Sequence, residues 1–386
     1  MALEISIVER PEQLASLSEE WSALCARSDQ NEPTLSPLWL GQWWRVFGGQ
    51  SGRRLKLARF VDGERLVGLV PLCARLFWHR PALPFRRLEL LASGENEADE
   101  ICSDYLGPIA ERGAEEEVAR ALAAALYSGA LGGWDELVLP AMDGSRALPS
   151  LIAGALENAG LHAERRVTGT APYIPLPSSW KGYLALLPSS RRYLVNRSLR
   201  DFAAFAGEPP RAHFAQNASE LKEGQRILKA LHQERWSEGG DPEAGVFRSP
   251  RFSAFHDAVM PKLLEAGALE LGWLSARGEP FAAVYNIVWN GKVYFYQSGR
   301  KLEVPKGIRP GIVLHALAIE RAIAAGLREY DFLAGDSQYK LQLALATRPL
   351  VEVRAVRAPL RERARLLTAF AIARSRTLRA RLRRAP

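Results

Sequence analysis

Three cations precede a Pro-Gly step in the second half of the sequence. Lys301, Lys306 and Arg309 come shortly before Pro310-Gly311, where a helix is predicted to begin. The first N–H groups of a helix have no partner within it and carry the positive end of the helix dipole. Phosphate groups bind readily at such an end, and glycine lets a ligand approach the backbone closely. The segment predicts either a phosphate site or an ordinary turn with solvated cations.

A carboxylate and a tyrosine follow this helix. Asp331 stands near the end of the next predicted strand, and Val138 occupies the matching position in the first half of the chain. A carboxylate can take a proton from an attacking group, and a tyrosine such as Tyr339 can give one to a leaving group. The alternatives are an ion pair of Asp331 with Arg328 or Lys340, and a half-buried tyrosine beside an exposed lysine.

A basic helix is predicted upstream of these residues. It carries four arginines, Arg191, Arg192, Arg197 and Arg200. Their spacing spreads them over a broad face, which indicates either a solvated surface or a site for a phosphorylated or nucleotide-linked sugar. Trp236, near the end of the following predicted helix, would stack on a sugar ring or pack in the core.

The elements that position these residues alternate between strands and helices, as in an α/β (α+β) fold. In the second half we predict strands Leu269–Ala276, Phe281–Trp289, Lys292–Gln297 and Glu329–Leu333, with helices Gly311–Ala325 and Gln338–Ala346. In the first half we predict strands Ile5–Val8, Leu55–Phe60, Arg65–Leu72 and Glu136–Leu139, with helices Gln13–Arg27, Pro37–Phe47, Ala114–Tyr127 and Ala147–Asn158. Helices Ser189–Phe205 and Ala218–Ser237 follow a proline-containing crossing at Gly169–Pro177.

Matching segments indicate an internal duplication. Gly63-Glu64 matches Gly278-Glu279, and Gly133–Leu139 matches Gly326–Phe332. The first-half helix that matches Gly311–Ala325 begins instead with three glutamates, which would repel an anion. If one half binds a phosphate-bearing cofactor, we therefore expect it to be the second.

Composition excludes several classes of protein. The 386 residues are 47% apolar and 24% charged, which is typical of a globular chain of about two domains. The longest uncharged stretches have 14 residues, whereas a membrane-spanning helix needs about 20. The N-terminus has no basic segment followed by an apolar run, and the three cysteines are far apart, so we expect a reducing cytoplasm. The sequence contains no HExxH, GxSxG, P-loop or GxGxxG motif, and we expect no metal.

The positive charge is concentrated at the C-terminus. Nine arginines and one acid from Arg361 onward account for the whole net charge of +8, so the rest of the chain is neutral. Arginines alternate there with apolar residues, which is typical of a basic amphipathic helix. Such a helix would contact an anionic inner-membrane surface or a synthase located there; otherwise it docks on the protein itself or forms a frayed end.

Several short motifs in a fixed order carry a family resemblance. They are Leu35-Ser36-Pro37, Trp43-Trp44, Ser103-Asp104-Tyr105, Arg191-Arg192, His232 to Trp236, Phe295-Tyr296-Gln297-Ser298-Gly299, Pro310-Gly311, Gly326 to Asp336 and Tyr339-Lys340. In order and spacing the chain resembles the CelD/BcsL family of GNAT-type acetyltransferases, which are associated with cellulose and exopolysaccharide biosynthesis. The resemblance spans about residues 1 to 355.

The resemblance implies two tandem GNAT-like domains similar to those of FemABX transferases, each a mixed, mostly antiparallel sheet flanked by helices. We expect an N-terminal domain without cofactor at residues 1–170, an acetyltransferase domain at 171–358 and a basic tail at 359–386. The cofactor implied is acetyl-CoA or another acyl-CoA. Residues 306–311 depart from the usual Gln/Arg-x-x-Gly-x-Gly/Ala run, so another activated acyl donor stays open.

The resemblance also implies the site residues. Acyl-CoA would meet Gln297, Ser298, Gly299, Lys306, Arg309, Pro310 and Gly311. The catalytic residues would be Asp331 as base, Tyr339 as acid and Lys340 as a group that binds the oxyanion or the acceptor. The acceptor would be bound by Arg192, Arg235, Trp236 and Tyr296.

The function expected is acyl transfer to an amine or hydroxyl of a sugar or polysaccharide precursor. One alternative is a FemABX-like aminoacyl transferase that uses aminoacyl-tRNA. The neutral body of the chain argues against it, and we expect no nucleic-acid partner. The other alternative is a catalytically silent GNAT-like protein that binds a polysaccharide synthase.

Overall fold

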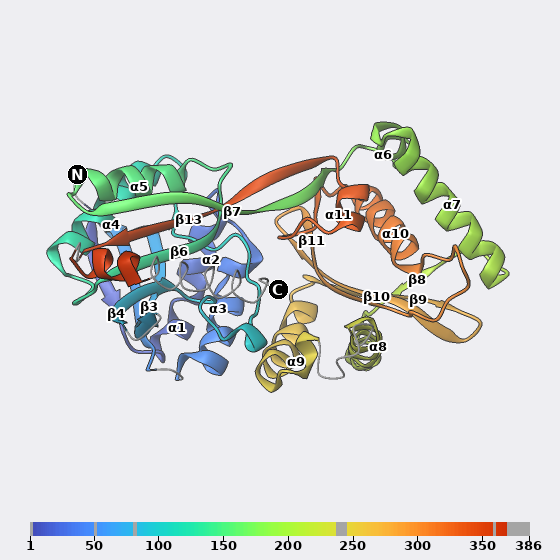
Figure 1. The fold of residues 1–386 in the computed structure, drawn as a ribbon, viewed down its shortest axis with the longest axis horizontal. Helices are drawn as coiled ribbons and strands as arrows, with labels where there is room; N and C mark the ends of the chain where they lie inside the picture. Colours follow the sequence, from blue (N-terminus) through green and yellow to red (C-terminus); the bar gives the residue numbers. More distant parts are fainter. Residues whose placement is uncertain (1–2, 50–51, 80–82, 237–244, 358–359, 369–386) are drawn as a thin grey trace, which may run out of the picture. The chain divides into compact units, whose positions relative to one another are not determined.

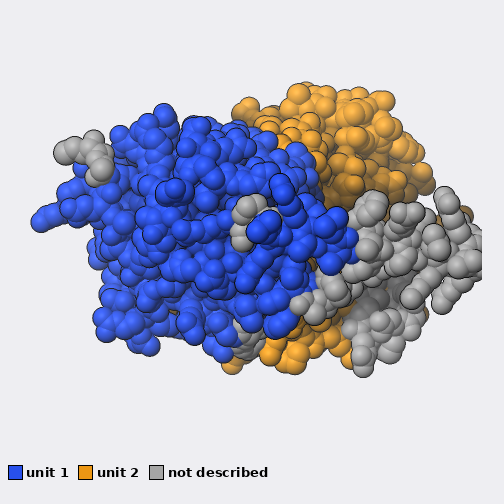
Figure 2. All heavy atoms as spheres, turned by 60° about the vertical axis from the view of Figure 1, so that its left-hand side comes forward, with its two compact units in different colours: residues 1–94, 105–168, 351–386 blue, residues 95–104, 169–350 orange. Residues whose placement is uncertain are grey.

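The chain folds into two compact units. The computed structural model describes residues 3–49, 52–79, 83–236, 245–357 and 360–368. Unit 1 comprises residues 1–94, 105–168 and 351–386, and unit 2 comprises residues 95–104 and 169–350 (Figure 1, Figure 2). Each unit is a mixed sheet flanked by helices, which is the α/β class expected from the sequence.

In unit 1 four antiparallel neighbours are followed by a parallel pair. The strands are β1 Glu4–Val8, β2 Arg54–Asp62, β3 Arg65–His79, β4 Leu83–Leu90, β5 Ile109–Ala110 and β6 Glu136–Asp143. β1 to β4 are antiparallel in sequence order, whereas β4 and β6 are parallel. A parallel pair needs a crossover, and α4 Glu115–Ser128 provides it. The other helices are α1 Gln13–Ser16, α2 Ser18–Ala26, α3 Pro37–Trp43 and α5 Leu148–Asn158.

Unit 2 repeats this order. Its strands are β8 Ala212–Phe214, β9 Leu269–Ala276, β10 Glu279–Trp289, β11 Lys292–Arg300 and β12 Glu329–Asp331. β8 to β11 are antiparallel neighbours, and β11 and β12 are parallel, with α10 Pro310–Ala324 as the crossover. The remaining helices are α6 Trp180–Leu186, α7 Ser189–Ala206, α8 Ala218–Trp236, α9 Pro250–Glu265 and α11 Gln338–Leu343. Figure 1 shows α10 and α7 on one face of this sheet, and α8 and α9 on the other.

Strand register confirms the predicted duplication. Glu136 lies opposite Arg87 in unit 1, and Glu329 lies opposite Lys292 at the same place in unit 2. Two residues further along, Val138 and Asp331 occupy matching positions. The fold of each half is therefore a version of the other.

Two long strands cross between the units along the chain. The second part of β7 His162–Pro175 pairs antiparallel with β12 in unit 2, and β13 Ala346–Val356 ends beside β6 in unit 1. The proline-containing crossing expected at Gly169–Pro177 is thus largely strand. Proline lacks an N–H but keeps its carbonyl, and the Pro172 carbonyl accepts the N–H of Phe332 at 2.9 Å.

The units are not continuous in sequence. The change at residues 168/169 lies beside the expected domain boundary at 170/171. Residues 95–104 belong to unit 2, although they lie within the expected N-terminal domain, and residues 351–358 belong to unit 1. The sequence pattern also did not indicate α9 or β13.

The start of the basic tail contacts unit 1. Residues 360–368 are helical. Arg361 pairs with Asp135 at 3.0 Å, and Glu362 pairs at 2.8 Å with Arg354, which also contacts Glu136 at 2.9 Å. The rest of the predicted tail, residues 369–386, lies outside the described part of the chain. Within that part, every helix is too short or too polar to cross a bilayer.

Helix α8 contacts the backbone of β11 directly. A Cβ added at Gly299 would lie 2.3 Å from the amide nitrogen of His232 and 2.5 Å from the carbonyl carbon of Leu231. Both are main-chain atoms of α8, so no side-chain rotation can relieve the overlap. Only glycine allows this approach.

We predict that Gly299→Ala lowers the free energy of unfolding by about 1–3 kcal/mol, because α8 must move away from the sheet. Urea denaturation followed by circular dichroism measures the change. Gly154→Ala is the matched control, since Gly154 lies within α5 and a Cβ there meets no atom within 4 Å. It should raise the stability by roughly 0.5–1 kcal/mol. Equal stability of the two variants would contradict the close approach.

Candidate functional site

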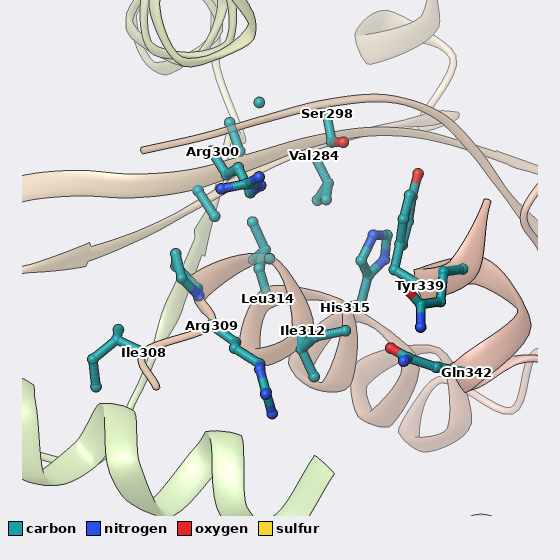
Figure 3. A pocket seen from close by; sticks show the side chains of 16 residues that line it. Val284, Ser298, Arg300, Ile308, Arg309, Ile312, Leu314, His315, Tyr339 and Gln342 are labelled. Atoms are coloured by element: carbon teal, nitrogen blue, oxygen red, sulfur yellow. The ribbon is translucent and has the colours of Figure 1, made fainter. Parts of the chain in front are cut away.

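Unit 2 contains a cavity of about 340 Å³ between the sheet and α10. Strands β10 and β11 form one wall, and the start of α10 and helix α11 form the other (Figure 3). Arg300, Ile308 and Arg309 lie toward one end, and His315 and Tyr339 lie toward the other. Six residues predicted for the site line this cavity together: Ser298, Gly299, Arg309, Pro310, Gly311 and Tyr339.

A β-bulge turns the end of β11 toward the cavity. Tyr285 pairs with Gln297 and Asn286 pairs with Phe295, so Tyr296 is the extra residue at this point of the register. Side chains alternate along a strand, and Phe295 packs in the core with α10. Without the bulge, Ser298 would face away from α10. The extra residue shifts the alternation of side chains by one position, so that Ser298 and Arg300 line the cavity.

The opening of α10 forms the polar end of the cavity. Pro310 is its first residue, and the first backbone bond of the helix runs from the Val313 N–H to the Arg309 carbonyl at 3.2 Å. The N–H groups of Gly311 and Ile312 precede that bond, in the turn where a helix leaves its donors unused. A Cβ at Gly311 would meet only the Arg300 Cδ, at 3.9 Å, so the space above the helix start is open. With two arginines beside it, this end suits an anionic group.

An aromatic pair closes the opposite end. The rings of His315 and Tyr339 stack with centroids 5.6 Å apart and an interplanar angle of 26°. The Nδ1 atom of His315 lies 3.2 Å from the Tyr330 hydroxyl. Burial raises the pKa of Tyr330 well above its usual value, so this hydroxyl keeps its proton. The pair places an imidazole and a phenol in one cavity.

Sequence reasoning missed the position of His315 in the cavity. It lies in α10 at the face that the predicted apolar positions Ile312 and Ile319 share, where it resembles a core residue. A polar side chain on an apolar helix face was the signal available. Arg300, Gln338 and Gln342 also line the cavity without having been predicted.

Asp331 and Lys340, two of the predicted catalytic residues, are not among the residues that line the cavity. Asp331 is fully buried; its Oδ1 accepts the N–H of Leu333 at 2.7 Å, and its Oδ2 lies 3.8 Å from Arg348. The ammonium group of Lys340 donates to the carbonyl of Ala334. Both side chains therefore hold the loop that connects β12 to α11.

The other predicted residues lie elsewhere in unit 2. Gln297, Lys306 and Arg192 do not line the cavity. The hydroxyl of Tyr296 donates to the carbonyl of Ile101 and lies 3.0 Å from the Nε2 atom of His256. Arg235 and Trp236 end helix α8, and their side chains are outside the described residues.

The matching helix of unit 1 begins differently. Helix α4 begins with Glu115, Glu116 and Glu117, whose charges oppose an anion. The short strand β5 pairs with Gly68 and Leu69 of β3. By strand register these residues match Ala282 and Ala283, which line the cavity in unit 2. In unit 1, therefore, strand β5 lies beside β3, the counterpart of β10. Acidic residues begin α4, the counterpart of α10.

Comparisons with known proteins give a family match within unit 2 and a fold match over most of the chain. Residues 189–341, which contain almost all of the cavity's lining, match the family model described as "Acetyltransferase (GNAT) domain". The crystal structure of FemX is similar with a TM-score of 0.62 and 10% sequence identity, over 94% of this chain and 100% of that chain. A conserved protein of unknown function from Bacteroides thetaiotaomicron VPI-5482 has a TM-score of 0.50 and 11% identity, over 92% and 100%. No curated protein sequence matches the chain.

These findings define the class to which unit 2 is similar. The chain has an α/β fold shared with FemX, and its second half contains a region that matches acetyltransferase domains of the GNAT type. Acyl transfer is the general chemistry that this match supports. Among the described residues no group of His, Cys, Asp or Glu side chains could hold a metal ion.

We predict that Asp331→Ala lowers the free energy of unfolding by about 1–3 kcal/mol, because a buried N–H loses its acceptor and Arg348 loses a nearby charge. Urea denaturation measures the loss. Asp336→Ala is the control, since Asp336 is an exposed acid in the same loop, and its effect should stay within about 0.5 kcal/mol. If Asp331→Ala were as stable as the parent protein, its carboxylate would not hold the loop.

Proposed function

We propose that this protein is an acyl-CoA-dependent acyltransferase that works in the cavity of unit 2. The observation that carries the proposal is the joint placement of an open helix start, two arginines, a histidine and a tyrosine around one cavity. The family match over residues 189–341 supports the same reaction class.

The polar end of the cavity fits a pyrophosphate. The N–H groups of Gly311 and Ile312 and the guanidinium groups of Arg300 and Arg309 would hold it by charge-assisted hydrogen bonds. The absence of a side chain at Gly311 leaves the room that such a group needs. The wall around Ser298 would then orient the acyl end of the cofactor toward His315 and Tyr339.

The chain's own residues would bind both reactants and move two protons. An acyl-CoA supplies a thioester whose carbonyl carbon is open to attack by an amine or hydroxyl. The acceptor must lose one proton and the departing thiolate must gain one. We assign the proton for the thiolate to the Tyr339 hydroxyl, and removal of the acceptor's proton to His315, because both side chains line the cavity. Much of the rate would come from holding both reactants in one cavity.

Asp331 and Lys340 take a different part in this proposal. Asp331 does not line the cavity, so we assign it the loop rather than the acceptor's proton. Lys340 binds the Ala334 carbonyl next to that loop. Both residues would position Tyr339 by holding the loop that leads into α11.

For the acceptor we propose a sugar or polysaccharide precursor with an amine or hydroxyl. The motif order that resembles the CelD/BcsL family supports this choice, and the arginines of α7 offer charge for a phosphorylated sugar. The arginine-rich C-terminus would bring the enzyme to the cytoplasmic face of the inner membrane.

We predict that Gly311→Glu abolishes binding of acetyl-CoA and CoA, because it puts a carboxylate where the pyrophosphate would lie. Isothermal titration should show micromolar binding by the parent protein. Gly311→Gln is the matched control, with the same size and no charge, and it should retain measurable affinity. If the parent protein binds neither ligand, the donor is another activated acyl group or the protein is a binding protein.

We predict that Tyr339→Phe lowers kcat by roughly 100-fold, the usual contribution of a general acid. KM for acyl-CoA should change little, since the ring and its stacking on His315 remain. A thiol-release assay with a responsive amine or hydroxyl acceptor measures both constants. An unchanged kcat would remove Tyr339 from proton transfer.

A further inference from the structure

A segment from the first half of the sequence is built into unit 2. Residues 95–104 lie between β4 and β5 in sequence but belong to the second compact unit. Asp99 accepts hydrogen bonds from the Ser249 hydroxyl at 2.6 Å and from the Arg251 guanidinium at 2.9 Å, both at the start of α9. We call residues 95–104 the strap.

The strap also reaches two places that shape the cavity. The carbonyl of Ile101 accepts the hydroxyl of Tyr296, the bulge residue of β11. The Oδ2 atom of Asp104 accepts the N–H of Ala334 at 2.7 Å, in the loop after β12. The bulge directs Ser298 into the cavity, and the loop leads into the helix that carries Tyr339.

Ala334 connects Asp104 to the cavity by a short series of bonds. Its N–H donates to Asp104, and its carbonyl accepts the ammonium group of Lys340. Lys340 is the direct neighbour of Tyr339, whose ring lines the cavity. Asp104 therefore holds the peptide unit before the Ala334 Cα atom, and Lys340 holds the peptide unit after it.

We propose that Asp104 is a positioning residue for the reaction assigned to unit 2, and that its ionised carboxylate holds the Ala334–Lys340 loop so that Tyr339 meets the substrate. This inference rests on the proposed function, because Tyr339 is the acid of that reaction. It makes the first half of the chain part of the site in the second.

The charge of Asp104 is costly for folding. Burial raises the pKa of Asp104 to about 6, against the opposing effects of the Ala334 N–H and Lys340. The other titratable groups around it are Tyr296 on β11 and Glu95, Glu100 and Cys102 on the strap itself. Since the pKa is higher than in an unfolded chain, this group contributes most to stability below about pH 4, and the contribution is lost as the pH rises through 6. If this side chain served only stability, a neutral residue in its place would stabilise the fold more at neutral pH.

The test compares Asp104→Asn and Asp104→Ala with the control Glu97→Gln, which changes an exposed acid of the same strap. Amide hydrogen exchange of residues 332–341 is measured by mass spectrometry at pH 7.5. Loss of a hydrogen bond to a charged group should speed exchange roughly 10- to 100-fold in Asp104→Ala, less in Asp104→Asn, and not at all in the control. Unchanged exchange in Asp104→Ala would overturn the proposal.

Thermal unfolding separates positioning from a merely structural role. At pH 7.5 we expect Asp104→Asn to unfold at the same temperature as the parent protein or a higher one, since it removes a charge with a raised pKa. Its kcat should nevertheless fall about tenfold, with KM for acyl-CoA unchanged. A lower melting temperature together with unchanged kcat would show that Asp104 serves only the fold.

The pH profile gives the third readout. Protonation of the proposed base lowers kcat in both proteins alike, so the two profiles are compared as a ratio. The ratio of kcat in the parent protein to kcat in Asp104→Asn should fall toward one as the pH drops through about 6, where Asp104 takes up a proton. A ratio that does not change with pH would overturn the role of the charge. If the parent protein transfers no acyl group from any acyl-CoA, the proposed function fails, whereas the exchange data still decide whether Asp104 holds the loop.

Discussion

The site of unit 2 depends on one extra residue in a β-strand, Tyr296 of β11. Tyr296 interrupts the pairing of β11 with β10, and from that point the strand presents the opposite set of side chains to α10. Ser298 and Arg300 face the cavity for this reason, and Gly299 faces the backbone of α8. A bulge disrupts local pairing and exposes polar backbone. Here the bulge residue is half-buried, and its hydroxyl donates to the Ile101 carbonyl.

The two halves of the chain keep the same support for their parallel strands while they differ at the helix openings. In unit 1 Glu136 is buried among Arg87, His79 and Arg354; burial opposes its charge, yet these partners lower its pKa to about 2. In unit 2 Glu329 occupies the matching place and pairs with Arg348 at 2.7 Å. In both halves, a glutamate on one of the two parallel strands forms ion pairs with basic side chains. The differences that matter for chemistry lie in the turns that lead into α4 and α10.

The sequence predicted the fold better than the site. Periodic apolar residues and Gly-rich turns located most strands and helices of both halves, because these signals are local. The helix opening at Pro310-Gly311 and the position of Tyr339 were also within reach, since their residue types suit the chemistry. The exclusion of Asp331 from the cavity was not, because it depends on the loop geometry after β12. Nor could His315 be told from a core residue, or Asp104 from a linker acid, since their partners come from distant parts of the chain.

The exchange of β7 and β13 between the halves has a consequence for biosynthesis. The β13 strand of unit 1 follows unit 2 in sequence, so unit 2 must be synthesised before that edge of β6 is covered. Until then β6 presents unpaired backbone donors and acceptors, the kind of edge that other chains can join. Unit 1 cannot be completed early, as N-terminal domains usually are. The first half therefore keeps an edge that can pair with other strands while unit 2 is being made.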